Sequence, residues 1–102
     1  MHLIQLFLPL YDNDRQLFNV AFFDIIKAEL TEKFGGITTY TRVPATGLWK
    51  ETEQKIIHDE IVLFEIMIQE IDLIYWNSFK VKLQNIFHQK EIIIRASPIQ
   101  LL

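Results

Sequence analysis

The chain has 102 residues, a formal net charge of −3 and no cysteine, and half of its residues are hydrophobic. This composition predicts one packed globular domain spanning residues 1–102, and it excludes disulfides, cysteine-based zinc sites and thiol nucleophiles. The acidic balance lacks the basic footprint that nucleic-acid binding needs, so we expect no nucleic-acid partner.

The amino-terminal stretch is apolar but short, and it lacks both the basic segment and the small-residue cleavage site of a signal peptide. No apolar run approaches the ~18 residues that a membrane-spanning helix needs. We therefore expect a cytoplasmic protein with no membrane partner.

The first two predicted elements are a strand and a helix. Residues 2–8 are largely apolar on both faces of a period-two pattern, which predicts an interior strand ended by Pro9. From residue 18 to residue 34, apolar side chains recur at helical spacing, and Gly35-Gly36 supplies the stop. The apolar stripe of this predicted helix comprises Phe18, Phe22, Ile25, Ile26, Leu30 and Phe34.

The next two elements form a predicted hairpin. Residues 37–43 are rich in β-branched side chains and predict a second strand, which Pro44 and the three residues after it stop. Residues 48–50 form a short strand or an arm. After a polar turn at residues 51–55, residues 56–68 predict a long third strand, so the two strands form a hairpin with a Trp-bearing tip.

A second helix and a fourth strand complete the pattern. Asp72 predicts the N-cap of the helix, and residues 91–96 predict the strand, which Ser97-Pro98 breaks. With right-handed crossovers, β-α-β-β-α-β predicts an α+β, ferredoxin-like fold with strand order 4-1-3-2 and both helices on one face. The apolar stripe of the second helix comprises Trp76, Phe79, Leu83, Ile86 and Phe87.

The face of the sheet away from the helices must meet solvent, a ligand or a partner. Strand alternation predicts that Glu65 points to this face, with Gln5 between it and Arg95. Tyr40 and Arg42 are predicted on the far side of Glu65. The outward side chains around this polar set are apolar: Leu3, Phe7, Leu63, Met67 and Ile93.

Three interpretations of the polar set stay open. In the first, Glu65 pairs with Arg42 or Arg95 beneath a second subunit, because buried charges must be paired. In the second, both arginines hold an anionic ligand in a small pocket while Glu65 and Tyr40 exchange protons or orient it. These four residues are then the candidate catalytic residues. The third is a solvated sheet face.

Gln5, Trp49 and His58 are the further candidate binding residues. Trp49 at the hairpin tip could anchor a partner or close over a pocket, or it could pack on its own sheet. His58 has carboxylate neighbours in the chain, but consecutive residues of a strand point to opposite faces. The three histidines show no ligand spacing, so we predict neither a metal nor a cofactor.

The segment from Phe34 to Trp49 resembles a family of small bacterial proteins of unknown function. The shared pattern is Phe-Gly-Gly, Thr-Arg-x-Pro-Ala and Gly-Leu-Trp, which stands here at residues 34–36, 41–45 and 47–49. This resemblance implies no activity, so it assigns no functional residue. More loosely, the topology is similar to the dimeric α+β barrel superfamily, in which two open sheet faces meet and enclose a cavity.

The sequence thus predicts a homodimer that buries its outward apolar residues in a two-fold interface. The alternative is a barrel-type enzyme acting on a small anionic or aromatic compound, with Glu65 as proton acceptor and Arg42 or Arg95 as an electrostatic clamp. An RNA-binding module is disfavoured, because the charge is acidic and no exposed aromatic pair for base stacking is evident on the central strands.

Overall fold

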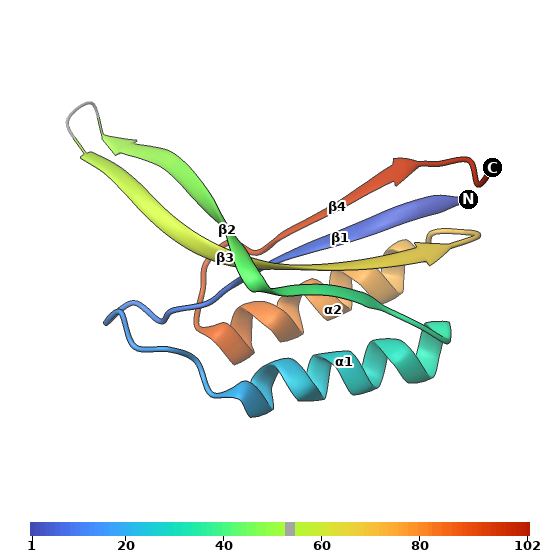
Figure 1. Cartoon of the computed structure of the whole chain (residues 1–102), viewed down its shortest axis with the longest axis horizontal. Helices are drawn as coiled ribbons and strands as arrows, with labels where there is room; N and C mark the ends of the chain where they lie inside the picture. The colour runs from blue at the N-terminus through green and yellow to red at the C-terminus, as the bar shows by residue number, and fades with distance from the viewer. Residues whose placement is uncertain (53–54) are drawn as a thin grey trace.

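The computed structural model describes the backbone of residues 1–52 and 55–102, and the side chains of residues 1–40 and 61–102. The elements follow the order β-α-β-β-α-β, an α+β, ferredoxin-like arrangement (Figure 1). They are β1 (His2–Pro9), α1 (Val20–Phe34), β2 (Thr38–Thr52), β3 (Lys55–Ile68), α2 (Leu73–Phe87) and β4 (Ile93–Pro98).

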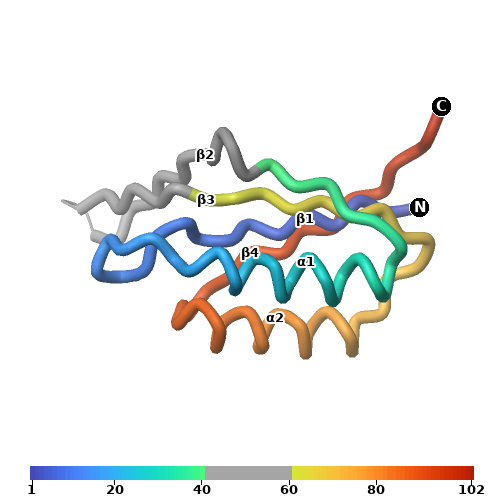
Figure 2. Tube along the Cα trace, turned by 60° about the horizontal axis from the view of Figure 1, so that its bottom comes forward, coloured from blue at the N-terminus to red at the C-terminus, as the bar shows by residue number. Residues whose placement is uncertain are grey.

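The four strands form one antiparallel sheet in the order β2-β3-β1-β4, which confirms the predicted order. Figure 2 shows α1 and α2 side by side on one face of this sheet, so the molecule has two layers. Within the described part of the chain, no helix is both long and apolar enough to cross a membrane.

The core lies between the sheet and the helices. Alternate residues of β1 and β3 supply its sheet side, as the period-two pattern predicted. The helices cover these rows with aromatic and aliphatic side chains spaced three and four residues apart. The buried set is Ile4, Leu6, Leu8, Phe23, Ile26, Leu30, Val62, Phe64, Ile66, Ile68, Trp76, Phe79, Leu83, Phe87 and Ile92.

Both helices end where local chemistry satisfies their free backbone groups. The Asn19 side chain accepts a hydrogen bond from the Ala21 amide, so α1 begins two residues later than predicted. The Asp72 carboxylate accepts from the Tyr75 amide, which confirms the predicted cap of α2. Gly35 ends α1 with φ at 82°, a left-handed conformation that glycine adopts without steric cost.

One member of the predicted α1 stripe is wrong. Ile25 is 53% exposed, whereas Phe23 is buried in the core. The buried positions Phe23, Ile26 and Leu30 lie three and four residues apart, so they share the face of α1 that meets the sheet. Ile25 lies on the side of α1 that faces away from the sheet.

The predicted breaks at two prolines are also wrong. β2 continues from Thr38 to Thr52, and the sheet register is irregular between Tyr40 and Ala45 instead of ending at Pro44. β4 runs through Pro98, which lies opposite His2, and it begins at Ile93 instead of residue 91. Both strands lie at sheet edges, where a residue without an N–H does not interrupt a central hydrogen-bond ladder.

The β2–β3 hairpin extends beyond the two-layered body (Figure 1). The last residue of β1, Pro9, lies opposite Ile61, and beyond that point β3 pairs only with β2. The predicted long hairpin is therefore present, and its outer half is a two-stranded ribbon from Thr46 to Thr52 and from Lys55 to Glu60.

Candidate functional site

The sheet face opposite the helices carries a row of polar residues in register. Gln5 at the middle of β1 lies opposite Glu65 on β3 and opposite Arg95 on β4. Neighbouring residues on paired strands point to the same side, and Ile4 and Leu6 face the core, so these three side chains point away from the helices. We call this side of the sheet the open face.

Four polar side chains on the open face are joined in one hydrogen-bonded line. Gln5 Nε2 donates to Glu65 Oε2 at 2.8 Å, and Tyr40 Oη donates to Glu65 Oε1 at 3.2 Å. Arg95 Nη2 donates to Gln5 Oε1 at 3.3 Å. This line, the open-face network, crosses all four strands from β4 through β1 and β3 to β2. The structure thus brings together four of the polar residues that the sequence placed on this face.

The charged groups on either side of Gln5, Arg95 and Glu65, set the orientation of the Gln5 side-chain amide. A guanidinium only donates hydrogen bonds, and an ionised carboxylate only accepts them. The amide oxygen of Gln5 must therefore face Arg95, and its nitrogen must face Glu65. Gln5 is a polarised link that connects a cation to an anion two strands away.

Of the two ion pairs that the first interpretation offered, the structure describes the side chains of only one, Glu65 with Arg95, and these two do not pair directly. Strands β3 and β4 are separated by β1, and neighbouring strands lie about 4.8 Å apart, so the two charged residues are about 10 Å apart at the backbone. Among the described side chains, Glu65 makes no ion pair with Arg95. The Arg95 guanidinium instead lies over the Phe7 ring, with its carbon 4.4 Å from the ring centroid.

The Glu65 carboxylate affects the pKa of the Tyr40 phenol. The pKa of Tyr40 is raised, first by its hydrogen bond to the Glu65 carboxylate and then by the negative charge of that carboxylate. Deprotonating the phenol would remove the donated bond and place two anions side by side. Tyr40 is therefore held in its neutral, donating form.

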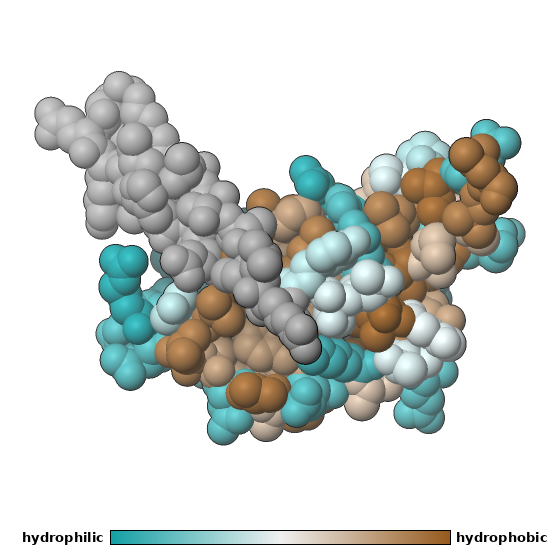
Figure 3. Space-filling model, in the orientation of Figure 1, coloured by the Kyte–Doolittle hydropathy of each residue, from teal (hydrophilic) through white to brown (hydrophobic). Residues whose placement is uncertain are grey.

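Apolar side chains border the open-face network. Met67 is 53% exposed and Ile93 is 56% exposed, whereas Leu3, Phe7 and Leu63 are half-buried. In the space-filling view, hydrophobic and hydrophilic residues are interspersed over the visible surface, and hydrophobic residues gather near the end of the molecule that holds both termini (Figure 3). A carboxylate and a guanidinium thus lie on a surface with substantial apolar area.

Three candidate residues lie outside the described side chains: Arg42, Trp49 and His58. The backbone places Arg42 in β2 within the irregular register that follows Tyr40. Trp49 pairs with Ile57 and His58 pairs with Leu48 in the outer part of the hairpin. The roles proposed for these three side chains stay predictions.

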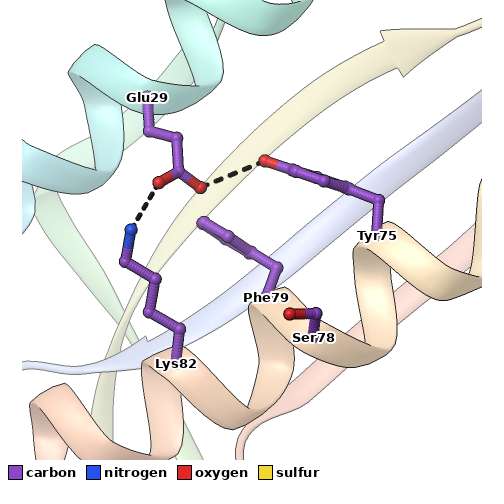
Figure 4. Close-up of a pocket in the computed structure, with 5 residues that line it drawn as sticks. All are labelled: Glu29, Tyr75, Ser78, Phe79 and Lys82. Carbon is purple, nitrogen blue, oxygen red and sulfur yellow. Dashed lines mark hydrogen bonds and ion pairs between the residues drawn. The ribbon is translucent and has the colours of Figure 1, made fainter.

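A second polar cluster, which the sequence did not predict, joins the two helices. The Glu29 carboxylate on α1 accepts a hydrogen bond from Tyr75 Oη at 3.2 Å and also contacts Lys82 Nζ, both on α2 (Figure 4). We call these three residues the inter-helix cluster. They border a hollow of about 200 Å³, which Ser78 and Phe79 complete.

The spacing of Tyr75 and Lys82 is the signal that could have indicated half of this cluster. Residues seven apart lie on the same face of a helix, so Tyr75 and Lys82 present a phenol and an ammonium together. The missing half is Glu29 on the other helix, which is not part of the apolar stripe predicted there. Its position depends on how α1 packs against α2.

Another hollow, of about 360 Å³, lies between the β1–α1 loop and the end of α2. The loop is held by Asp12, whose carboxylate accepts from the amides of Asp14 and Gln16. These bonds close a turn and leave the carboxylate engaged by backbone. Among the side chains that the structure describes, no group of three or more His, Asp or Glu residues could hold a metal ion.

Comparison with known proteins identifies a fold relative. No protein-family model matches the chain, and no curated protein matches it. Among solved structures, the chain is similar to a phage SAM lyase in complex with S-methyl-5'-thioadenosine, with a TM-score of 0.64 and 12% sequence identity. The similarity covers 94% of this chain and 79% of the lyase, and at this identity it shows the fold alone.

Proposed function

We propose that this protein is a homodimer that associates through the open face of its sheet. The observation that carries the proposal is the open-face network, in which Arg95, Gln5, Glu65 and Tyr40 are already hydrogen-bonded to one another. Covering a polar group is costly when it loses its hydrogen bonds to water without replacement. A face whose polar groups are mutually bonded avoids much of that cost.

The apolar border of the network supports the same proposal. The exposed surfaces of Met67 and Ile93, together with the half-buried Leu3, Phe7 and Leu63, lie on one side of one small sheet. Burial of apolar area is favourable by about 25 cal/mol per Å², and a two-fold interface buries each side chain twice. A surface that is largely apolar, and whose polar groups are hydrogen-bonded to one another, has the composition expected of a homodimer interface.

Analytical ultracentrifugation tests the proposal with a matched pair of variants. We expect the wild-type protein to sediment as a dimer at micromolar concentration. Met67→Lys should weaken the dimer by about tenfold or more, because it places a charge in the covered apolar area. The control is Val81→Lys on α2, since Val81 is 55% exposed and Met67 is 53% exposed.

Two outcomes would contradict self-association through this face. One is a wild-type monomer throughout the micromolar range. The other is a dimer that Met67→Lys and Val81→Lys weaken equally, because the open face would then contribute no more than the helix layer. Circular dichroism of each variant establishes that the fold is retained before the comparison is made.

A second candidate function is small-molecule chemistry in a cavity between two open faces. The Gln5 amide and the Tyr40 hydroxyl orient the Glu65 carboxylate, whose oxygens can accept a further hydrogen bond or face a cation. The guanidinium of Arg95 suits an anionic group. The fold relative holds S-methyl-5'-thioadenosine, a compound with an aromatic base, which favours a small aromatic ligand as the first to be tested.

Calorimetry with S-methyl-5'-thioadenosine, and chromatography after incubation with SAM, test the second candidate. Binding or turnover should fall by about tenfold or more in Glu65→Gln, because the amide removes the negative charge while keeping the shape. Glu29→Gln is the control, since it makes the same change in the inter-helix cluster. Absence of binding at about millimolar ligand together with unchanged SAM would remove this candidate.

A further inference from the structure

The register of the open-face network has a consequence for the symmetry of the proposed dimer. Glu65, Gln5 and Arg95 lie side by side on β3, β1 and β4, at one level along the strands. A negative charge therefore lies one strand to one side of Gln5, and a positive charge lies one strand to the other side. Among the described side chains at this level of the sheet, the charges are antisymmetric about β1.

Two-fold axes that bring one flat face onto a copy of itself must lie in the plane between the faces. An axis along β1 exchanges the two sides of β1, so it brings Arg95 of one subunit over Glu65 of the other, and does so twice. An axis across the strands keeps each side in place. When it passes at the level of Gln5, it brings Arg95 over Arg95 and Glu65 over Glu65. Like charges that face each other repel, so the charge pattern discriminates between these two axes.

We infer that the dimer has its two-fold axis nearly parallel to β1 above Gln5, with reciprocal ion pairs between Arg95 and the partner's Glu65. The inference rests on the proposed self-association and adds its geometry. Within one chain Gln5 keeps the two charges apart, and in the dimer each finds a direct partner across the interface. Packed sheets lie about 10 Å apart, a gap that an arginine and a glutamate side chain together can span.

The positions of the apolar residues are compatible with the same axis. Leu63 and Ile93 flank Phe7 on β3 and β4 in the same manner as the charged pair flanks Gln5. The axis along β1 places Ile93 over the partner's Leu63 and Phe7 over the partner's Phe7. Both axes keep the strands of the two sheets aligned within about 30°, the common way in which sheets pack face to face, so the side-chain pattern decides between them.

Charge reversal tests this geometry. Arg95→Glu and Glu65→Arg each turn both intersubunit pairs from attractive to repulsive, so each single variant should dimerise about 100-fold more weakly or worse. An equimolar mixture of the two variants restores both pairs, because the introduced carboxylate then faces the introduced guanidinium and the native Glu65 faces the native Arg95. The mixture should regain a dissociation constant within about tenfold of the wild-type value.

Two exposed charges away from the open face provide matched controls. Lys90→Glu changes the net charge as Arg95→Glu does, and Glu32→Lys changes it as Glu65→Arg does. Both controls should dimerise as the wild type does. A wild-type dimer that neither open-face reversal weakens beyond its control would overturn the inferred axis while leaving self-association in place. A monomeric wild type would instead overturn the proposed function itself.

Cross-linking provides a second measurement that does not depend on the reversals folding well. The chain has no cysteine, so Glu65→Cys and Arg95→Cys each introduce a single thiol. A short bismaleimide should link the mixture of the two variants in higher yield than either variant alone. Preferential linking of like positions in the separate variants would indicate the axis across the strands and contradict the inference.

Discussion

The open-face network and the inter-helix cluster contain the same pair of groups in different surroundings. In each, a tyrosine hydroxyl donates to a glutamate carboxylate at 3.2 Å: Tyr40 to Glu65 on the sheet, and Tyr75 to Glu29 between the helices. They differ in the third partner. Glu29 also contacts the Lys82 ammonium, whereas Glu65 also accepts from the neutral amide of Gln5.

The third partner explains why we interpret the inter-helix cluster as a structural contact and the open-face network as a candidate site. A neighbouring ammonium neutralises Glu29, so the inter-helix cluster joins α1 to α2 and presents little net charge. A neutral amide leaves the charge of Glu65 in place, because a hydrogen bond does not cancel it. The phenols differ correspondingly. Burial is the first cause of the raised pKa of Tyr75, and the hydrogen bond to Glu65 is the first cause for Tyr40.

The largest expected difference between the clusters is in stability. Tyr75 contacts the rings of Phe34, Trp76 and Phe79, with centroids 5.7, 5.1 and 5.7 Å away. Tyr75→Ala should therefore lower the free energy of unfolding by about 2 kcal/mol or more. Tyr40→Ala, at a 48% exposed position, should cost much less. Urea denaturation of both variants at one protein concentration and one oligomeric state makes the comparison, and equal losses would contradict it.

The next difference is in alkaline stability. Burial, followed by the charge of Glu29 and the hydrogen bond to it, raises the pKa of Tyr75 well above the ordinary value of 10.0. A raised pKa in the folded state means that the unfolded chain loses its proton first. The stabilisation is therefore complete below pH 10 and is lost as the pH rises above it. Tyr75→Phe should reduce this alkaline loss of stability, and Tyr40→Phe should reduce it less.

Denaturation curves measured below and above pH 10 check this second prediction. Each phenylalanine variant keeps the ring and removes only the hydroxyl, so the difference isolates the titrating group. An alkaline loss that is the same in wild type and Tyr75→Phe would show that this phenol does not carry it.

The smallest expected difference is in salt dependence. Glu29→Gln removes an ion pair whose two side chains are both partly exposed, so the loss of stability should be below about 1 kcal/mol. That loss should shrink between about 0.01 M and about 1 M salt, as the screening length falls from about 30 Å to about 3 Å. The loss of stability caused by Glu65→Gln, measured on the monomer, should depend less on salt concentration, because the described hydrogen-bond donors to Glu65 are neutral. If the stability loss depended more on salt in Glu65→Gln than in Glu29→Gln, Glu65 and not Glu29 would be the carboxylate held by an ion pair.

Much of the open face could be predicted from residue order alone, because strand alternation is a local property. Once the order of elements indicated a split βαβ sheet, parity placed Gln5, Glu65 and Arg95 on one side. The predictions that failed concern residues whose local preference yields to their surroundings. Pro44 and Pro98 usually end strands, yet both lie in edge strands where the missing N–H is tolerated.

Ile25 shows the corresponding difficulty in a helix. Several apolar residues stand close together in this segment, so more than one stripe fits the helical period. The contact with the sheet selects the stripe that contains Phe23 and leaves Ile25 exposed. The choice among such stripes depends on the packed partner, which lies far away in the chain.

The sequence by itself determined the order of the elements, the topology of the sheet and the face on which Glu65 lies. These follow from periodicity, turn chemistry and handedness, which act between residues close in the chain. Only the tertiary structure decided that Gln5 bridges Glu65 and Arg95, and that Glu29 meets Tyr75 and Lys82. Such contacts require side chains from distant segments to reach within about 3 Å of each other, and strand spacing and helix packing set that distance.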